Sequence, residues 1–211
     1  MKGLFISGSG TNVGKTFIAE RLIRLLSKTR SVAVRKPVES DCKVVNGMLI
    51  THDAVALQKA SNIVENINNV CRYQFTQCSS GESASIASDK VLGLTDLVDA
   101  CQSNNYVVVE GAGGLLSPIA LDTLNIDLAA TLKLPLVLVI KDELGAVNQA
   151  LLVIKVAEQY NLKIACVVLN QIIENTLDNV IAIKRYSDCK VVIYNEKKLD
   201  LFESEIDRVF T

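Results

Sequence analysis

The 211-residue sequence is poor in histidine, proline and aromatic residues, with one histidine, three prolines and no tryptophan. Because His52 stands alone, a metal site built from several histidines is excluded, and a serine or cysteine triad would have to use it. The 22 Lys+Arg and 23 Asp+Glu leave a formal net charge of -1, which argues against a protein that binds nucleic acid through many phosphate contacts. Apolar runs stay well below the ~18 residues of a membrane-spanning helix. We therefore expect neither a nucleic-acid nor a membrane partner.

The cysteines also lack an informative pattern. Six are spread along the chain without a C-x-x-C pair or the spacing of metal ligands. Cys101 lies among apolar residues in an expected helix, and Cys166 and Cys189 lie at expected strands. Buried reduced thiols are therefore favoured over disulfides. Since the N-terminal apolar run is also too short for a signal peptide, we expect a cytoplasmic protein.

Short apolar segments alternate with longer segments that have the period of a helix. Strands are expected at residues 4–6, 32–34, 106–109, 136–140, 164–169 and 191–194. Helices are expected at residues 15–26, 52–60, 95–102 with Thr95 as the N-cap, 126–132, 146–160, 176–186 and 199–209. This alternation predicts a doubly wound α/β fold of the P-loop NTPase type, with a mostly parallel sheet and helices on both faces. Residues 1–211 are expected to form one domain, with ligands at the carboxyl ends of the strands.

A glycine-rich loop follows the first expected strand and opens directly into the first expected helix. Residues 8–16 read G-S-G-T-N-V-G-K-T, which is one residue longer than the usual phosphate-binding loop. Glycines let backbone N–H groups surround phosphate oxygens, and the start of the helix adds partial positive charge. Lys15 is expected to reach the terminal phosphates and Thr16 to give a hydroxyl to Mg²⁺. The alternative, a glycine-rich turn with a chance Lys-Thr pair, is disfavoured by the strand–loop–helix context.

Charged side chains follow other strands at the same edge of the expected sheet. Glu110 ends an apolar strand and precedes G-A-G-G, which is typical of a carboxylate that holds Mg²⁺ beside a phosphate loop; an acidic strand cap is the alternative. Lys36 follows the second strand and either stabilises a phosphoryl group in transfer or is simply solvated. Asp53 lies in the first turn of an expected helix, as a second Mg²⁺ ligand or as a compensating charge for the helix dipole. His52 is expected to be a surface or cap residue.

Four motifs in this order resemble the dethiobiotin synthetase family. They are the loop at residues 8–16, K-P-V at 36–38, D-A-V-A-L at 53–57 and V-E-G-A-G-G at 109–114, and the resemblance spans residues 4–170. It implies an ATP-dependent ligase that carboxylates 7,8-diaminononanoate with CO₂ and closes the cyclic urea of dethiobiotin in biotin biosynthesis. The steps implied are a carbamate, its phosphorylation by ATP and displacement of phosphate by the neighbouring amine. ATP and Mg²⁺ are the implied cofactors, and a homodimer is the implied assembly.

The resemblance also implies roles for individual residues. Lys36 is the implied active-site lysine, with Lys15 and Thr11 beside it. The implied nucleotide contacts are Asn12, Val13, Gly14, Lys15, Thr16, Phe17, Asp53, Glu110, Gly111, Ala112, Gly113 and Asn170, the last at the purine edge. The implied Mg²⁺ ligands are Thr16, Asp53 and Glu110. The implied substrate contacts are Thr11, Ser40 and, across the dimer interface, Gly145, Ala146 and Asn148.

The sequence departs from the family pattern at four places. Gly10 replaces an aspartate of the loop, Asn12 stands where an acid is common, and the segments at residues 80–82 and 194–196 differ from their family counterparts. The loop, metal and lysine positions are retained, while the choice of nucleobase is left open.

Two other kinds of protein fit the sequence less well. A partition-type or regulatory P-loop ATPase would bind a protein partner, but partition ATPases carry a second lysine five residues before the final one, where this chain has Gly10. An enzyme that amidates cobyrinic acid would need a glutaminase domain, for which a 211-residue chain has no room.

Overall fold

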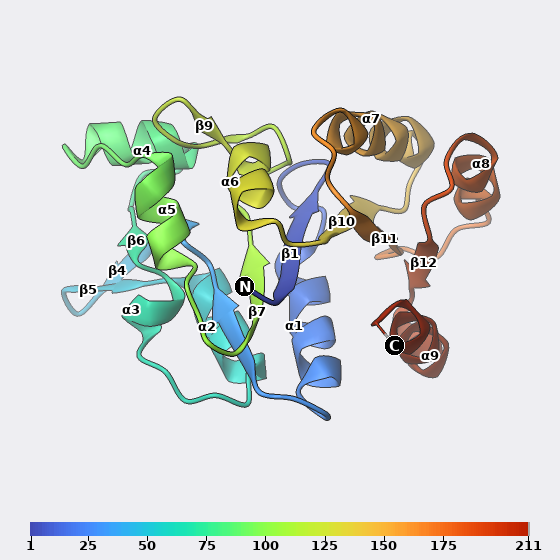
Figure 1. The fold of residues 1–211 in the computed structure, drawn as a ribbon, viewed down its shortest axis with the longest axis horizontal. Helices are drawn as coiled ribbons and strands as arrows, with labels where there is room; N and C mark the ends of the chain where they lie inside the picture. The colour runs from blue at the N-terminus through green and yellow to red at the C-terminus, as the bar shows by residue number, and fades with distance from the viewer. Residues whose placement is uncertain (211) are drawn as a thin grey trace.

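The centre of the structure, a computed structural model that describes residues 1–210, is a six-stranded sheet in which each neighbouring pair is parallel (Figure 1). The strand order is β12 (Val191–Tyr194), β11 (Ile164–Asn170), β10 (Leu136–Lys141), β1 (Gly3–Gly8), β7 (Tyr106–Glu110) and β2 (Val32–Arg35). In the middle of the sheet, Phe5 of β1 pairs with Leu136 on one side and Val109 on the other. This order confirms the predicted doubly wound, parallel α/β fold.

Helices cover both faces of this sheet (Figure 1). One face carries α5 (Leu94–Ala100), α6 (Asn125–Leu132), α7 (Ala146–Gln159) and α8 (Asn179–Tyr186); the other carries α1 (Lys15–Leu26), α2 (His52–Ala60) and α9 (Leu199–Phe210). Side chains alternate along each strand, so Phe5 of β1 packs in the core under the first set of helices, and Leu4 and Ile6 pack under the second. The apolar strands of the sequence are thus explained by burial on both sides.

Several short elements were not predicted from the sequence. They are β3 (Val38–Glu39) paired with β6 (Tyr73–Gln74), the hairpins β4 (Lys43–Val45)/β5 (Met48–Ile50) and β8 (Pro118–Ala120)/β9 (Thr123–Leu124), the helices α3 (Ile67–Val70) and α4 (Gly81–Ala87), and the 3₁₀ turn η1 (Glu196–Lys198). Segments of two to seven residues are too short to show a period. Three of them, β3, β8 and α4, contribute residues to the cavity of the site described below.

Some predicted boundaries were wrong. Thr95 is not the N-cap of α5, because the helix begins at Leu94 and Asp96 accepts a hydrogen bond from the backbone N–H of Gly93 at 2.9 Å. The helix expected from residue 176 begins only at Asn179. Cys189 lies half-buried just before β12 and not in the strand.

All six cysteines are free thiols, as expected. Cys42, Cys71, Cys101 and Cys166 are buried, whereas Cys78 is exposed. Across residues 1–210, no helix combines the length and the apolar character that crossing a membrane requires.

Candidate active site

The glycine-rich loop joins β1 to α1 at the carboxyl edge of the sheet. Gly14 has a φ of 92°, a conformation that strongly favours glycine, and a Cβ there would clash with the side-chain amide of Asn170. That amide, at the end of β11, donates a hydrogen bond to the carbonyl oxygen of Val13 at 3.0 Å. A strand that is separated from β1 by β10 therefore holds the loop, and Asn170 is buried against the loop with only 2% of its surface exposed.

Replacing Asn170 is expected to weaken nucleotide binding through the loop. Asn170→Ala removes one hydrogen bond and should raise the Kd for ATP about fivefold, which corresponds to ~1 kcal/mol. Asn170→Asp should have a larger effect, because a carboxylate would face the Val13 carbonyl oxygen, which is also an acceptor. Calorimetric titration with ATP measures both, with the exposed Asn104→Asp as the control. Equal affinities for the alanine and aspartate variants would contradict this role.

Lys15, the first residue of α1, folds back over its own loop. Its Nζ donates to the carbonyl oxygen of Gly10 at 2.7 Å. Burial and, to a smaller extent, the nearby charge of Lys36 lower the pKa of Lys15 to about 8, against the opposing effect of Glu110 and Asp53. Among the described residues, the Lys15 ammonium thus donates to one neutral acceptor, the Gly10 carbonyl oxygen. A phosphate oxygen is charged and therefore a stronger acceptor, so it can take the place of that carbonyl.

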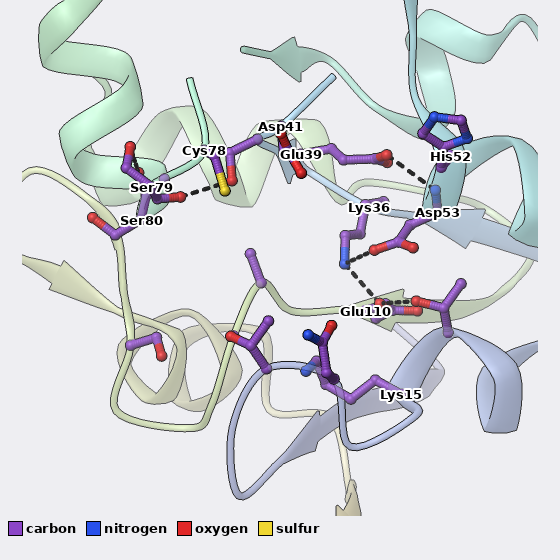
Figure 2. A pocket seen from close by; sticks show the side chains of 18 of the residues that line it. Lys15, Lys36, Glu39, Asp41, His52, Asp53, Cys78, Ser79, Ser80 and Glu110 are labelled. Atoms are coloured by element: carbon purple, nitrogen blue, oxygen red, sulfur yellow. Dashed lines mark hydrogen bonds and ion pairs between the residues drawn. The ribbon is translucent and has the colours of Figure 1, made fainter. Parts of the chain in front are cut away.

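Lys36 directly follows β2 and lies between the carboxylates of Asp53 and Glu110 (Figure 2). Its Nζ donates to Glu110 Oε1 at 2.6 Å and to the Gly111 carbonyl at 3.1 Å, and lies 3.1 Å from Asp53 Oδ2. The Thr16 hydroxyl also donates to Glu110 Oε1, at 2.8 Å. Sequence segments that lie 94 residues apart, the loop and the end of β7, therefore meet at one carboxylate oxygen.

The charges of this group reinforce one another. Burial alone would lower the pKa of Lys36, but Glu110 and Asp53 outweigh it, so the pKa is raised. Burial would likewise raise the pKa of Asp53, but Lys36 outweighs it, so the pKa is lowered. Lys36 is 3% exposed and Glu110 0%, which means that the lysine is a fixed buried cation and not the solvated strand-end residue of the alternative interpretation.

Glu39 also belongs to this region, and the sequence analysis did not single it out. It lies on β3, and its two carboxylate oxygens accept hydrogen bonds from the backbone N–H groups of Asp53 (3.0 Å) and Ala54 (2.9 Å) at the start of α2. Burial raises the pKa of Glu39. In the sequence it is marked only as an acidic residue three positions after Lys36.

Asn125, the first residue of α6, fixes the glycine turn after β7. Its side chain donates to the carbonyl oxygens of Ala112 (2.6 Å), Gly114 (3.0 Å) and Ser117 (3.1 Å), and accepts from the Ala112 N–H (3.1 Å). Asn125 is fully buried. No motif of the sequence marked it, because its partners are all backbone atoms.

These groups surround a cavity of about 800 Å³ (Figure 2). Predicted site residues that line it are Thr11, Asn12, Gly14, Lys15, Thr16, Phe17, Lys36, Ser40, Asp53, Glu110, Ala112 and Gly113. Lining residues that were not predicted include Glu39, Asp41, His52, Cys78, Ser79, Ser80, Gly81, Ser117 and Pro118. The cavity therefore extends from the phosphate loop to Ser40 and the segment before α4, with Lys36 between the two ends.

Six predicted residues are not among those that line this cavity. Val13, Gly111 and Asn170 are buried behind its wall. Gly145, Ala146 and Asn148 lie at the start of α7, where Gly145 has a φ of 94° and Asn148 is exposed. The start of α7 is nevertheless linked to the phosphate loop, because the Ser9 hydroxyl donates to Gln149 Oε1 at 2.9 Å.

The oxygen atoms near Lys36 fit a magnesium ion bound together with a nucleotide. Thr16 offers a hydroxyl, Asp53 and Glu110 offer carboxylates, and Glu110 Oε2 has no hydrogen-bond partner among the described residues. No three His, Cys, Asp or Glu side chains within residues 1–210 form a metal-binding group by themselves. Two carboxylates are sufficient for Mg²⁺, which keeps several waters and usually binds phosphate oxygens as well.

Together, the parallel sheet, the G-K-T loop between β1 and α1 and the buried carboxylate at the end of β7 define a P-loop nucleotide-binding protein. Solved structures agree on the fold. A plasmid partition protein from Borrelia burgdorferi superposes with a TM-score of 0.63 over 99% of this chain and 98% of its own, at 13% identity. The apo form of Cyanothece McdA gives a TM-score of 0.58 over the full length of both chains, at 14% identity. At such identities the likeness shows the fold alone.

Sequence relatives identify the family. A family model described as an AAA domain matches residues 2–197. The ATP-dependent dethiobiotin synthetase BioD of Vesicomyosocius okutanii is 58% identical over 99% of this chain and 97% of its own length. That of Ruthia magnifica is 57% identical over 99% of this chain and 98% of its own. The chain belongs to the dethiobiotin synthetase family, as its motifs indicated.

Proposed function

We infer that this chain is an ATP-dependent dethiobiotin synthetase of biotin biosynthesis. The structural observation that carries this function is Lys36, a buried cation held between the phosphate loop and the Ser40 end of one cavity. A ligase that joins CO₂ to an amine through a phosphorylated intermediate needs a fixed positive charge where the phosphoryl group is transferred. The two relatives at 57–58% identity carry the name of this activity.

Each end of the cavity has its own task in this proposal. The N–H groups of residues 12–17 and the Nζ of Lys15 bind the ATP phosphates, with Phe17 at the edge and the turn at residues 111–113 as the wall on the substrate side. Thr11 and Ser40 contact the diamine, 7,8-diaminononanoate. Lys36 stabilises the negative charge of the carbamate and of the phosphoryl group.

The chemistry proceeds in three steps that this arrangement accommodates. One amine of the substrate attacks CO₂, which forms a C–N bond and releases a proton. An oxygen of the resulting carbamate then attacks the γ-phosphorus, and ADP leaves. Finally the second amine attacks the carbonyl carbon and loses a proton, phosphate leaves, and the cyclic urea is closed.

Mg²⁺ belongs to this proposal as a partner of ATP. Thr16, Asp53 and Glu110 would hold it, and the bound ion would neutralise part of the charge on the phosphates. The orphaned oxygen of Glu110 supports this assignment, since a buried carboxylate oxygen without a donor is otherwise costly.

The substrate carboxylate has a separate site in the proposal. Gly145, Ala146 and Asn148 begin α7, and the partial positive charge of a helix start suits a carboxylate. We propose that this helix start serves the cavity of a second copy in a homodimer. We also propose that the chain forms one domain and that its location is cytoplasmic. The free thiols support the location, because disulfides are rare in the cytoplasm.

A partition-type or regulatory ATPase is the second candidate, because its fold is the same. Such a protein would need a second lysine in the loop, at the position of Gly10. A Cβ at Gly10 would meet no described atom within 4 Å, so packing does not force a glycine there. The missing lysine therefore favours the ligase.

Stimulation of ADP release by the diamine separates the two candidates. With Mg²⁺, bicarbonate and 7,8-diaminononanoate, the rate of ADP formation is expected to rise well above the rate without diamine. ATP, GTP and CTP should be compared side by side, because the altered segment at residues 194–196 leaves the nucleobase open. An ATPase rate that ignores the diamine, measured on folded protein that binds ATP, would favour the partition-type reading.

A further inference from the structure

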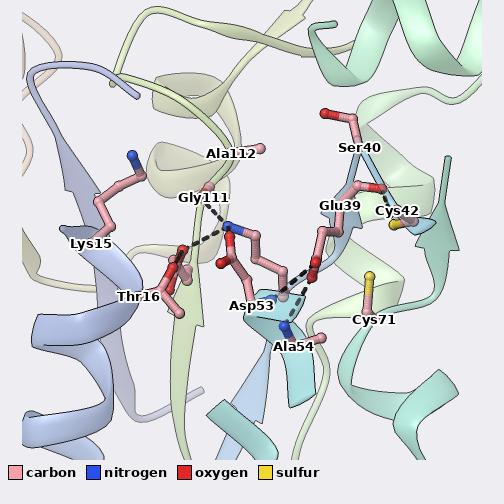
Figure 3. Close-up of polar contacts among 12 residues, drawn as sticks. Lys15, Thr16, Glu39, Ser40, Cys42, Asp53, Ala54, Cys71, Gly111 and Ala112 are labelled. Carbon is pink, nitrogen blue, oxygen red and sulfur yellow. Dashed lines mark hydrogen bonds and ion pairs between the residues drawn. The ribbon is translucent and has the colours of Figure 1, made fainter. Parts of the chain in front are cut away.

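The helix α2 is capped from outside its own segment. Its N-cap residue Thr51 makes no side-chain hydrogen bond to the helix start in the described chain. The first turn would therefore leave N–H groups without partners. Glu39 supplies two acceptors for these N–H groups: one carboxylate oxygen accepts from the Asp53 N–H at 3.0 Å and the other from the Ala54 N–H at 2.9 Å (Figure 3). The start of α2 is thus fastened to β3.

Glu39 is a firm anchor for this purpose. Its strand β3 pairs in parallel with β6, where Glu39 lies opposite Gln74. The Glu39 carbonyl accepts hydrogen bonds from the Phe75 N–H at 2.9 Å and from the Cys42 thiol at 3.4 Å. Glu39 is 6% exposed, so its carboxylate cannot move far without breaking this packing.

Asp53 depends on that anchor more than the other carboxylate does. Glu110 is fully buried at a strand end, whereas the Asp53 side chain is 42% exposed on the first turn of a helix. Helix ends fray unless they are capped. The hydrogen bond to the backbone N–H of Asp53 fixes the backbone from which the Asp53 carboxylate extends toward Lys36.

We propose that Glu39 is a positioning residue that sets Asp53 for metal and nucleotide binding, an inference that rests on the role of Asp53 in the proposed function. Both Glu39 oxygens already accept backbone N–H groups, which distinguishes its task from that of a metal ligand. Its effect on the cation is transmitted through the backbone of Asp53 and Ala54.

The test measures binding of Mn²⁺, as a substitute for Mg²⁺, by electron paramagnetic resonance in the presence of a non-hydrolysable ATP analogue. Glu39→Ala is expected to raise the Kd for Mn²⁺ about tenfold, in line with the loss of a helix cap. Glu39→Gln keeps one acceptor oxygen and should raise it about threefold, a partial rescue. Where the alanine variant fails to fold, the glutamine variant carries the test.

Two further variants separate positioning from a general loss of stability. Asp96→Ala removes an exposed acidic cap from α5, away from the cavity, and should lower Tm without changing the Kd for Mn²⁺. Asp53→Asn should weaken Mn²⁺ binding strongly, and adding Glu39→Ala to it should weaken binding no further, because both act on one side chain.

The outcomes are distinguishable. The positioning role alone is overturned by either of two results. In the first, Glu39→Ala has the same Kd for Mn²⁺ as the unmodified protein. In the second, Glu39→Ala raises this Kd by the same factor whether or not Asp53→Asn is present. Unchanged Mn²⁺ binding in Asp53→Asn itself overturns the role of Asp53 in the proposed function, and the inference with it.

Discussion

Lys36→Ala is expected to lower the rate of dethiobiotin formation by about a hundredfold to a thousandfold, the effect of removing one preorganised charge-stabilising donor. The ammonium of Lys36 lies at the junction of the nucleotide and substrate ends of the cavity and is 3% exposed. Water cannot replace it without entering a buried site. The measurement is single-turnover formation of ADP and cyclic urea at saturating ATP and diamine.

Stability must be measured alongside activity for this variant. Removing Lys36 leaves Glu110 as a buried carboxylate with the Thr16 hydroxyl as a neutral donor, and breaking such a pair costs about 3–5 kcal/mol. Lys155→Ala is a suitable control, since that lysine is an exposed partner of Glu158. A Lys36→Ala protein that is folded and turns over at the normal rate would refute the assigned role.

Glu110→Gln is expected to have the second large effect, on both stability and activity. The amide keeps the size of the side chain but removes the charge that lies 2.6 Å from the Lys36 ammonium, so the free energy of unfolding should fall by about 3 kcal/mol. Turnover should drop at least about a hundredfold, because the position of Lys36 and one proposed Mg²⁺ ligand are lost together. Chemical denaturation and the coupled ADP assay measure the two effects.

A double variant identifies the cause of that destabilisation. Lys36→Met combined with Glu110→Gln leaves no unpaired buried charge. The free energy of unfolding of this double variant should therefore fall by less than the sum of the decreases in the two single variants. Strictly additive losses would show that the 2.6 Å ion pair is not the source of the effect.

The extent to which the sequence predicted the site depended on the type of interaction. The loop, Lys36 and Glu110 could be found because they follow apolar strands, and the carboxyl ends of parallel strands meet at one edge. Asp53 could be found from its place in the first turn of a helix and from the D-A-V-A-L motif. Glu39 and Asn125 were missed because they bind backbone atoms that lie 14–15 and 8–13 residues away in sequence, respectively. Such pairing has no residue-type signature. The strand β3 that carries Glu39 was missed because two residues are too few to show a period.

The position of Asn170 illustrates a further limit. The sequence placed it correctly at the end of a strand, but whether its amide faces a nucleobase or the loop depends on side-chain orientation. In the structure the amide donates to the carbonyl of Val13. Its proposed contact with the purine therefore stays a prediction, to be tested with the nucleotide comparison described above.

The most direct test of the proposed ligase is the fate of labelled carbon. Folded protein incubated with ATP, Mg²⁺, 7,8-diaminononanoate and ¹⁴C-bicarbonate is expected to yield acid-stable label in the ring carbonyl of dethiobiotin, one label for each ADP formed. ADP formation without acid-stable label, in protein that binds both ATP and the diamine, would contradict the account.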